Sequence, residues 1–329
     1  MRPTQVYDSY WLFAAERLAI YYRKQEKTEG SWTDDPVMAK FRFTNTYRAA
    51  DRVSQYLIRE VQYAPCRSQA PVDLFFRTLL FKLFNRIETW EAIESAVGPI
   101  EWRPGILERI EPVLDRLMRH GKRVYSAAYI MPAPRLGGER KHANHLFLLK
   151  QMMDDRLPDR LRQAPDLATA YEMLLRYPGL GRFLAFQYAI DLNYSEMLDF
   201  SESEFVVAGP GAIDGISKCF EDYARYRPED IIHAMTGRQD EEFSRLGLSF
   251  PGLYGRPLQP VDCQNLFCEI SKYARVAHPD VRGTADRTRI KQVYKPSPRL
   301  PVPPMYPPKW GLCIGEAEAP QGEIQAALL

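Results

Sequence analysis

A Pro-Gly-Leu-Gly turn containing Gly179 and Gly181 constrains the fold more than any other feature of this chain. The turn lies between two helix-like segments, residues 167–176 and 182–193, and so predicts a helical hairpin. The glycines allow a tight turn and expose backbone N–H groups at the start of the second helix. Such a helix start, with Arg182 beside it, suits one DNA phosphate. We expect a DNA-binding helix-hairpin-helix unit, although similar turns also occur in helical hairpins that bind nothing.

The rest of the chain also has a helical pattern. Alternating strand patterns are absent, so we predict an all-α fold. We expect one domain over residues 1–295, made of two helical lobes with a cleft (roughly 1–130 and 140–295), followed by a proline-rich extension over 296–329. Apolar residues recur at helical spacing over residues 7–24, 44–61, 72–84, 89–97, 99–117, 125–130, 142–153, 167–176, 182–193, 211–226 and 258–276.

Charge is distributed unevenly along the chain. The formal net charge of +2 does not by itself require a nucleic-acid partner. Cations nevertheless gather between residues 271 and 309, among them Arg275, Arg289 and Lys291, and only two aspartates oppose them. A basic stripe of this kind can neutralise DNA phosphates. The alternative is a solvated basic tail.

The cysteines and histidines give no metal signal. The five cysteines are scattered without a Cys-x-x-Cys pair, which disfavours a disulfide framework or a zinc ribbon. His142 and His145 form a His-x-x-His pattern without a third ligand, so we predict no metal and no cofactor. The chain has neither an apolar leader nor a run of about 18 apolar residues, and we expect a cytoplasmic protein without membrane or obligate protein partners.

A second glycine motif, Ala-Gly-Pro-Gly-Ala at residues 208–212, opens another expected helix. Gly209 and Gly211 would let the backbone approach an anion or a sugar closely. The alternative is a plain turn in which proline starts the helix. The residues that follow do not complete a nucleotide phosphate loop, because Ile216 stands where the pattern requires lysine.

Three acidic residues are candidates for catalysis. Asp191 and Asp199 lie between the two glycine motifs, and Glu269 lies in a polar helix over residues 262–273. A carboxylate near the sugar could stabilise the cation-like transition state of glycosidic cleavage or orient water. Glu269 could also act as a general base. The alternative for Asp191 and Asp199 is a helix cap or a solvated acid, and the alternative for Glu269 is a structural pair with Lys272 on the same helix face.

Two groups of side chains could bind a base or a phosphate, one around residues 42–51 and one in the polar helix over residues 262–273. Asn45, Arg48 and Asp51 would share one face of the helix expected over 44–61, and the alternative for them is a surface ion-pair network. A flipped base needs stacking and hydrogen-bonding partners of the kinds found here. The complete set of candidates is Trp32, Arg42, Asn45, Tyr47, Arg48, Asp51, Asn265, Lys272 and Tyr273.

Four sequence blocks together resemble one family. They are Phe-Thr-Asn-Thr-Tyr-Arg-x-x-Asp-Arg at 43–52, the Tyr-Pro-Gly-Leu-Gly hairpin at 177–181, Gly-Pro-Gly-Ala at 209–212 and Cys-Glu-x-x-Lys-Tyr-x-Arg at 268–275. The chain resembles, over residues 5–295, the alpha-glutamyl/putrescinyl thymine pyrophosphorylase family, also described as the helical domain of 5-hydroxymethyluracil DNA kinases. The resemblance implies a branch of the helix-hairpin-helix DNA glycosylase fold and action on hypermodified pyrimidines in phage-type DNA.

We therefore predict a monofunctional DNA glycosylase that flips and excises a hypermodified pyrimidine, such as glucosylated 5-hydroxymethylcytosine, in anti-phage defence. Strand cleavage is not expected, because Phe183 occupies the position where bifunctional lyases keep lysine. The alternative is a transferase in which an amine displaces pyrophosphate from a 5-hydroxymethyluracil derivative, with Arg42, Arg48 and Arg52 holding the pyrophosphate. A third possibility is a non-enzymatic module that recognises modified DNA.

Overall fold

The computed structural model describes residues 1–26, 31–127, 131–295 and 302–314. Regular structure in these ranges is helical, with isolated bridges between extended segments, so the all-α prediction is confirmed. The α-helices are α1 (Val6–Gln25), α2 (Pro36–Lys40), α3 (Arg52–Tyr56), α4 (Pro71–Phe84), α5 (Ile87–Val97), α6 (Ile106–Arg119), α7 (Lys141–Asp154), α8 (Leu157–Arg162), α9 (Leu167–Leu175), α10 (Arg182–Asn193), α11 (Pro210–Cys219), α12 (Pro228–Gly237), α13 (Gln239–Arg245) and α14 (Pro260–Ala277).

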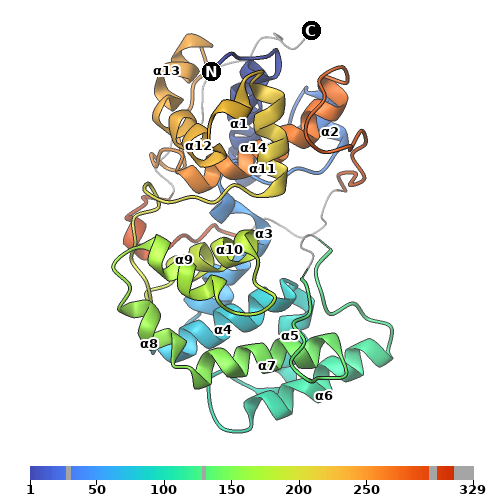
Figure 1. Cartoon of the computed structure of the whole chain (residues 1–329), viewed down its shortest axis with the longest axis vertical. Helices are drawn as coiled ribbons and strands as arrows, with labels where there is room; N and C mark the ends of the chain where they lie inside the picture. The colour runs from blue at the N-terminus through green and yellow to red at the C-terminus, as the bar shows by residue number, and fades with distance from the viewer. Residues whose placement is uncertain (27–30, 128–130, 296–301, 315–329) are drawn as a thin grey trace. The chain divides into compact units, whose positions relative to one another are not determined.

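The chain forms two compact units, each built from separate stretches of sequence (Figure 1). Unit 1 contains the described residues within Met1–Asp51, Glu202–Pro304 and Gly311–Leu329. Unit 2 contains Arg52–Ser201 and Met305–Trp310. This division differs from the consecutive lobes that we expected, because helices from opposite ends of the chain pack together in unit 1.

The predicted C-terminal extension is divided in the same way. Its residues 296–301 and 315–329 lie outside the described part of the chain, as do residues 128–130 of the helix expected over 125–130. Met305–Trp310, in contrast, packs within unit 2, where Gln55 exchanges two hydrogen bonds of 2.9 Å with the backbone of Met305. The short helix η4 (Pro308–Trp310) places Trp310 edge-on to Tyr194.

Helix α14 forms the centre of unit 1 and packs against α1, α2, α11 and α12. Its buried side chains meet aromatic residues of α1: Phe267 lies 4.7 Å from Tyr10 and Tyr273 lies 5.4 Å from Phe13, measured between ring centroids. Aromatic pairs of this kind bury large apolar areas and prefer tilted or edge-on geometry. The N-terminal helix is therefore part of the core.

The closest helix packing in unit 1 joins α11 to α14. A Cβ atom on Gly215 would lie 2.0 Å from the carbonyl oxygen of Phe267, and one on Gly211 would lie 3.1 Å from Cys268 Sγ. The two glycines are four residues apart and share one helix face. Part of the Gly-Pro-Gly motif thus serves helix packing.

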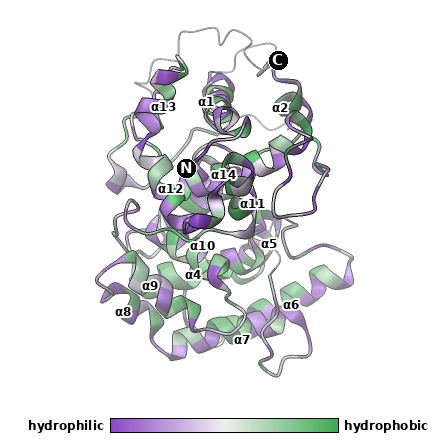
Figure 2. Ribbon diagram, turned by 45° about the horizontal axis from the view of Figure 1, so that its top comes forward, coloured by the Kyte–Doolittle hydropathy of each residue, from purple (hydrophilic) through white to green (hydrophobic). Residues whose placement is uncertain are grey.

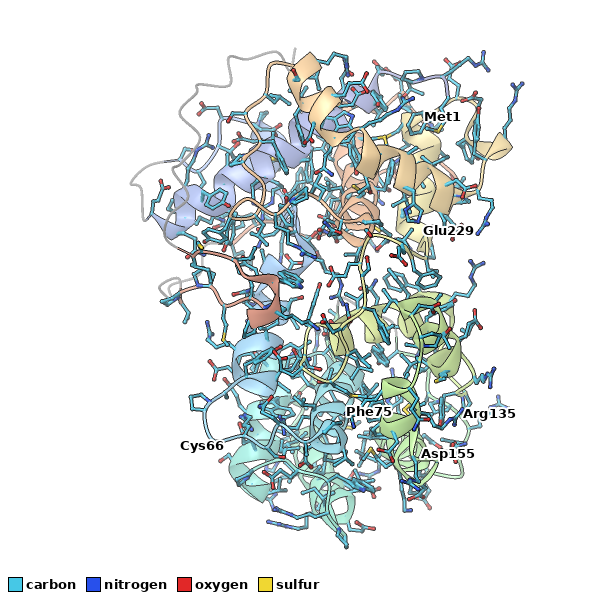
Figure 3. All side chains as sticks on the ribbon, turned by 90° about the vertical axis from the view of Figure 1, so that its left-hand side faces the viewer. Met1, Cys66, Phe75, Arg135, Asp155 and Glu229 are labelled. Atoms are coloured by element: carbon cyan, nitrogen blue, oxygen red, sulfur yellow. The ribbon has the colours of Figure 1, made fainter. Side chains whose placement is uncertain are left out.

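Helix α4 forms the centre of unit 2, where it packs against α5, α7, α8 and α10. Phe75 lies in the interior of this unit, whereas Cys66 lies at its edge (Figure 3). The ribbon of α4 is mostly hydrophobic, while that of α6 alternates in hydropathy (Figure 2). Helix α6 buries one face, through Ile106, Ile110 and Leu114.

The predicted helical hairpin is present in unit 2. Helices α9 and α10 pack together, and their bounds agree with the predicted segments to within one residue. Gly179 has a φ of +84°, which favours glycine, and Gly181 is the N-cap of α10. The Asp166 side chain caps α9 by accepting a hydrogen bond from the Thr169 amide at 2.7 Å. Binding of a DNA phosphate by this hairpin stays a prediction.

The helix expected over residues 44–61 is wrong in its first half. Residues 44 and 45 have no regular structure and residues 46 and 47 form a bend, followed by the 3-10 turn η1 (Arg48–Ala50), by α3 and by one π-helical segment, η2 (Leu57–Gln62). Asn45, Arg48 and Asp51 therefore do not share a helix face. Tertiary hydrogen bonds hold this loop instead.

Other boundaries also differ from the helical pattern. The helix expected over 211–226 ends at Cys219 and is followed by the 3-10 turn η3 (Tyr223–Arg225). The helix expected over 99–117 begins at Ile106. The pattern did not predict α2, α8, α12 or α13, which are at most ten residues long.

Substitution Gly215→Ala should destabilise unit 1, because the added methyl group would overlap the Phe267 backbone, which has no rotamer to change. We expect a loss of at least about 2 kcal/mol in the free energy of unfolding, measured by chemical denaturation. Gly237→Ala is the matched control, since nothing lies within 4 Å of a Cβ there. Equal stabilities for the two variants would contradict the close packing of α11 on α14.

Candidate functional site

Residues 43–45, a loop without regular structure, lie against α14 in unit 1, and this contact brings several predicted site residues together. The Thr44 amide donates a hydrogen bond to Glu269 Oε2 at 2.9 Å. Asn265 Nδ2 donates to the Asn45 carbonyl oxygen at 3.0 Å and lies 3.2 Å from Thr44 Oγ1. We call the side chains of Arg17, Asn45, Asp51, Asn265 and Glu269 the polar cluster.

Arg17 was not among the predicted residues. From the buried face of α1 its Nε donates to the Thr44 carbonyl oxygen at 2.9 Å, and its Nη2 donates to Asn45 Oδ1 at 2.6 Å. Burial lowers the pKa of this guanidinium, and the nearby carboxylates of Asp51 and Glu269 oppose that effect. Arg17 follows the buried Phe13 by four residues, so an α-helix places both on one face. A cation on an apolar helix face is the sequence signal that could have identified it.

Asn45 is held at every polar group. Its side chain accepts from Arg17 and donates to the Ala50 carbonyl oxygen at 2.6 Å, while its amide donates to Asp51 Oδ1 at 2.8 Å. Burial raises the pKa of Asp51 to about 6, although the Asn45 amide counteracts the shift. These bonds fix the loop conformation, and base reading by Asn45 or Asp51 stays a prediction.

Glu269 and Lys272 form an ion pair beside this loop. Lys272 Nζ lies 2.7 Å from Glu269 Oε2, and the two side chains are 18% and 10% exposed. The ammonium group also lies 4.7 Å from the centre of the Phe43 ring. A carboxylate here can accept a proton, and the adjacent cation can neutralise a phosphate oxygen. The pair is therefore the most chemically capable part of the predicted site.

Tyr47 and Arg48 are buried, and the Tyr47 hydroxyl and the Arg48 backbone amide make hydrogen bonds within unit 1. Tyr47 Oη donates to the Arg256 carbonyl oxygen at 2.6 Å. The Arg48 amide donates to Asp262 Oδ1 at 2.9 Å, and Asp262 also joins Gln259 in the capping box of α14. Burial raises the pKa of Asp262 to about 7. Lining of a base pocket by Tyr47 and Arg48 remains a prediction.

The remaining predicted substrate residues differ in exposure. Tyr273 Oη donates to the buried Asp35 carboxylate at 2.6 Å. Burial is the main cause of the raised Tyr273 pKa, and the hydrogen bond to Asp35 raises it further. Trp32 is half-buried, with Lys24 Nζ 5.9 Å from its ring. Arg42 is exposed, and its amide donates to the Gln292 carbonyl oxygen at 2.9 Å.

The residues predicted to bind DNA in unit 1 lie on three parts of the chain: α11, α14 and the segment that follows α14. Gly209 is the N-cap of α11, and Gly211 packs against Cys268. Arg289 and Lys291 are exposed on an extended segment, and Arg275 Nη1 donates to the Arg289 carbonyl oxygen at 3.3 Å. The basic stripe is thus anchored to α14, unlike a solvated tail.

The other predicted catalytic acids belong to unit 2. Asp191 is fully buried, and its Oδ2 lies 3.2 Å from Lys82 Nζ. Asp199 is 86% exposed and lies 3.7 Å from Lys309 Nζ. Arg182, at the start of α10, is exposed. The burial of Asp191 favours a structural role.

The described residues contain no group of three or more His, Cys, Asp or Glu side chains placed to hold a metal ion. Asp115 lies 2.9 Å from His142 Nε2, and His145 contacts Tyr125 and the Pro132 backbone. Within the same part of the chain, no helix has the length and apolarity needed to span a membrane.

The chain matches the model of a family described as "5-hmdU DNA kinase, helical domain" over residues 4–283. It is also 28% identical over 295 residues to a 5-hmdU DNA kinase of Bacillus phage SP10. This alignment covers 82% of the present chain and 45% of the phage protein, so the chain spans less than half the length of this relative. No solved protein structure matches the chain.

These similarities correct the functional prediction. They connect the chain with a kinase family, which transfers groups, whereas we predicted a DNA glycosylase that hydrolyses glycosyl bonds. The prediction of base excision is therefore wrong, and the defence role attached to it is not carried further. The resemblance to the helical domain of 5-hydroxymethyluracil DNA kinases is confirmed, whereas the relation to the glycosylase fold stays a prediction. The transferase alternative agrees better with these findings.

Substitution Lys82→Met should destabilise unit 2, because it removes the cation that faces the buried Asp191 carboxylate. We expect a loss of about 3–5 kcal/mol in the free energy of unfolding, measured by urea denaturation. The double variant Lys82→Met/Asp191→Leu should recover most of this loss. A double variant no more stable than the single one would show that the ion pair is not the main interaction at this place.

Asp262 should make stability depend on pH. Its pKa is about 7 in the folded protein and 3.8 as the reference value, so between these values the native state holds a proton that the unfolded state loses. The stabilisation is present below about pH 4 and is lost as the pH rises through about 7.

Relative to Asp262→Asn, the wild-type protein should lose roughly 2–3 kcal/mol of unfolding free energy between about pH 5 and pH 8. Denaturation curves at several pH values measure this difference, and Asp240→Asn on the exposed face of α13 is the control. Parallel pH profiles for the wild type and Asp262→Asn would contradict the raised pKa.

Proposed function

Since this chain belongs to the family of 5-hmdU DNA kinase helical domains, we propose that it is a transferase acting on 5-hydroxymethyluracil, or a derivative of it, in DNA. The family match covers the polar cluster, α14 and the predicted hairpin. The name of the phage relative supports DNA as the substrate and the 5-hydroxymethyl group as the reacting group. Phage-type DNA is the expected source of such a base.

One observation carries the assignment to unit 1: the Glu269–Lys272 pair beside the Phe43 ring. An aromatic ring can stack on a pyrimidine, the carboxylate can remove a proton, and the ammonium group can bind a phosphate oxygen. The pair is mostly buried, which strengthens electrostatic interactions with a bound group. Hydrogen bonds from Thr44 and Asn265 fix the loop beside it.

The reaction that suits this pair is displacement at the exocyclic methylene carbon. An amine nitrogen would attack that carbon, the carbon–oxygen bond would break, and pyrophosphate would leave with the bonding electrons. Glu269 would accept the proton released by the amine, and Lys272 would neutralise the departing pyrophosphate. Arg48 is buried, and the proposal therefore assigns the leaving group to Lys272.

The second candidate is phosphoryl transfer, which the name of the phage relative favours. The 5-hydroxymethyl oxygen would attack the terminal phosphorus of a nucleoside triphosphate, and the nucleoside diphosphate would leave. Glu269 would then accept the hydroxyl proton. The phosphate-loop pattern in this chain is incomplete at Ile216, so we place the displacement reaction first.

Two incubations separate these reactions. DNA carrying 5-hydroxymethyluracil is incubated with ATP and Mg²⁺, and DNA carrying the pyrophosphorylated base is incubated with putrescine. Nucleosides released by digestion are then identified by mass spectrometry. Displacement predicts an aminated nucleoside in the second incubation, and phosphoryl transfer predicts a phosphorylated nucleoside in the first.

Substitution Glu269→Gln should lower kcat about 100-fold, because an amide cannot accept the proton. Lys272→Met should lower the rate at least about tenfold, because it removes charge neutralisation at the leaving group. Glu241→Gln and Lys122→Met, at exposed positions, are the controls. Full activity in Glu269→Gln, or no nucleoside product in either incubation, would refute the proposal.

A further inference from the structure

Residues 282–295 of unit 1 form an exposed basic segment, which we call the basic strap. It contains one acidic residue, Asp286. Its five cations are all exposed, namely Arg282, Arg287, Arg289, Lys291 and Lys295. This density of one sign of charge suits a polyanion.

The first end of the strap is fastened to α11. The Ala285 amide donates to Asp214 Oδ1 at 2.7 Å, and the Thr284 amide donates to Ser217 Oγ at 3.1 Å. Asp214 is itself buried, with Lys218 Nζ 3.3 Å from its Oδ2. A Cβ atom on Gly283 would lie 2.2 Å from Asp214 Oδ1, so the strap approaches this pair as closely as glycine permits.

The middle and the far end of the strap are fastened as well. Arg275 of α14 donates to the Arg289 carbonyl oxygen, and the Ile290 side chain is buried. Farther along, the Arg42 amide donates to the Gln292 carbonyl oxygen at 2.9 Å, and the Tyr294 amide donates to the Lys40 carbonyl oxygen at 2.9 Å. The backbone is thus held at both ends, while the charged side chains point to solvent.

The charges gather around one buried side chain. Arg289 and Lys291 are exposed on either side of the buried Ile290. Two exposed cations this close together can contact phosphates of the same DNA strand. The exposed Arg42 joins the strap through its backbone pairing. A fixed backbone also reduces the conformational entropy that binding costs.

We propose that the basic strap binds the sugar-phosphate backbone of DNA without regard to sequence, and so holds the strand on unit 1, which also carries Glu269 and Lys272. The proposal rests on the proposed function in one respect, namely that DNA is the substrate. The buried Asp214–Lys218 pair is the anchor that keeps the strap in place.

The test is the salt dependence of binding to a plain DNA duplex. The triple variant Arg289→Ser/Lys291→Ser/Lys295→Ser should make the slope of log K against log salt concentration shallower by about 2–3. Affinity at physiological salt should fall at least about tenfold. Arg119→Ser/Lys122→Ser/Arg123→Ser removes the same charge from exposed positions in unit 2 and should leave the slope unchanged.

A second measurement tests the fastening. Trypsin cleaves after lysine and arginine, and the fastened strap of the wild-type protein should resist it. In Gly283→Ala, the added methyl group forces the strap away from Asp214 and should expose it to cleavage. We expect cleavage within 282–295 to be at least about tenfold faster in that variant, and bound DNA to slow cleavage of the wild-type strap. Rapid cleavage of the wild-type strap, unaffected by DNA, would overturn the proposal.

The two proposals fail in different ways. Plain DNA contains no modified base, so the salt slope does not depend on the chemistry. A strap variant with the wild-type slope would overturn the strap proposal even if base modification occurs. If the triple variant shows the expected shallower slope but no modified nucleoside forms, the strap proposal stands and the proposed reaction is refuted.

Discussion

Buried carboxylates that accept hydrogen bonds from backbone amides hold unit 1 together. A backbone N–H group outside regular structure still needs a partner when water cannot reach it. Glu269 binds the Thr44 amide, Asp262 binds the Arg48 amide, and Asp214 binds the Ala285 amide. Glu269 and Asp262 lie on α14, and Asp214 lies on α11, which packs against it. The two helices therefore fix the irregular segments that surround them.

This constraint explains why acidic residues recur in motifs that otherwise look like a binding site. Two effects act on the pKa of a buried carboxylate that accepts an amide hydrogen bond: burial raises the pKa, and the hydrogen bond lowers it. For Asp262 and Asp51, burial dominates and raises the pKa into the physiological range. Glu269 differs in having a close cation, Lys272, within 2.7 Å. Glu269 is the acid that the proposed reaction uses.

The close packing of α11 on α14 connects the proposed reaction site with the basic strap. Gly215 permits the approach of the two helices, and Asp214 beside it anchors the strap at Ala285. On α14, Lys272 points to the loop at Phe43, and Arg275 reaches the strap at Arg289. One helix thus serves both the predicted base-binding residues and the predicted backbone-binding residues.

The sequence by itself determined the helical class, the hairpin at Gly179 and the family, because helical periodicity, turn glycines and motif blocks are local properties of the chain. It also pointed to Glu269 and Lys272. Only the tertiary structure decided that residues 44–47 are not helical, since the hydrogen bonds that hold Thr44 come from Glu269 and Arg17, which are distant in sequence. It likewise decided that Asp191 is buried against Lys82 and that the basic segment is fastened rather than loose. Partners brought together by folding leave no periodic signal, and for that reason they were not predictable.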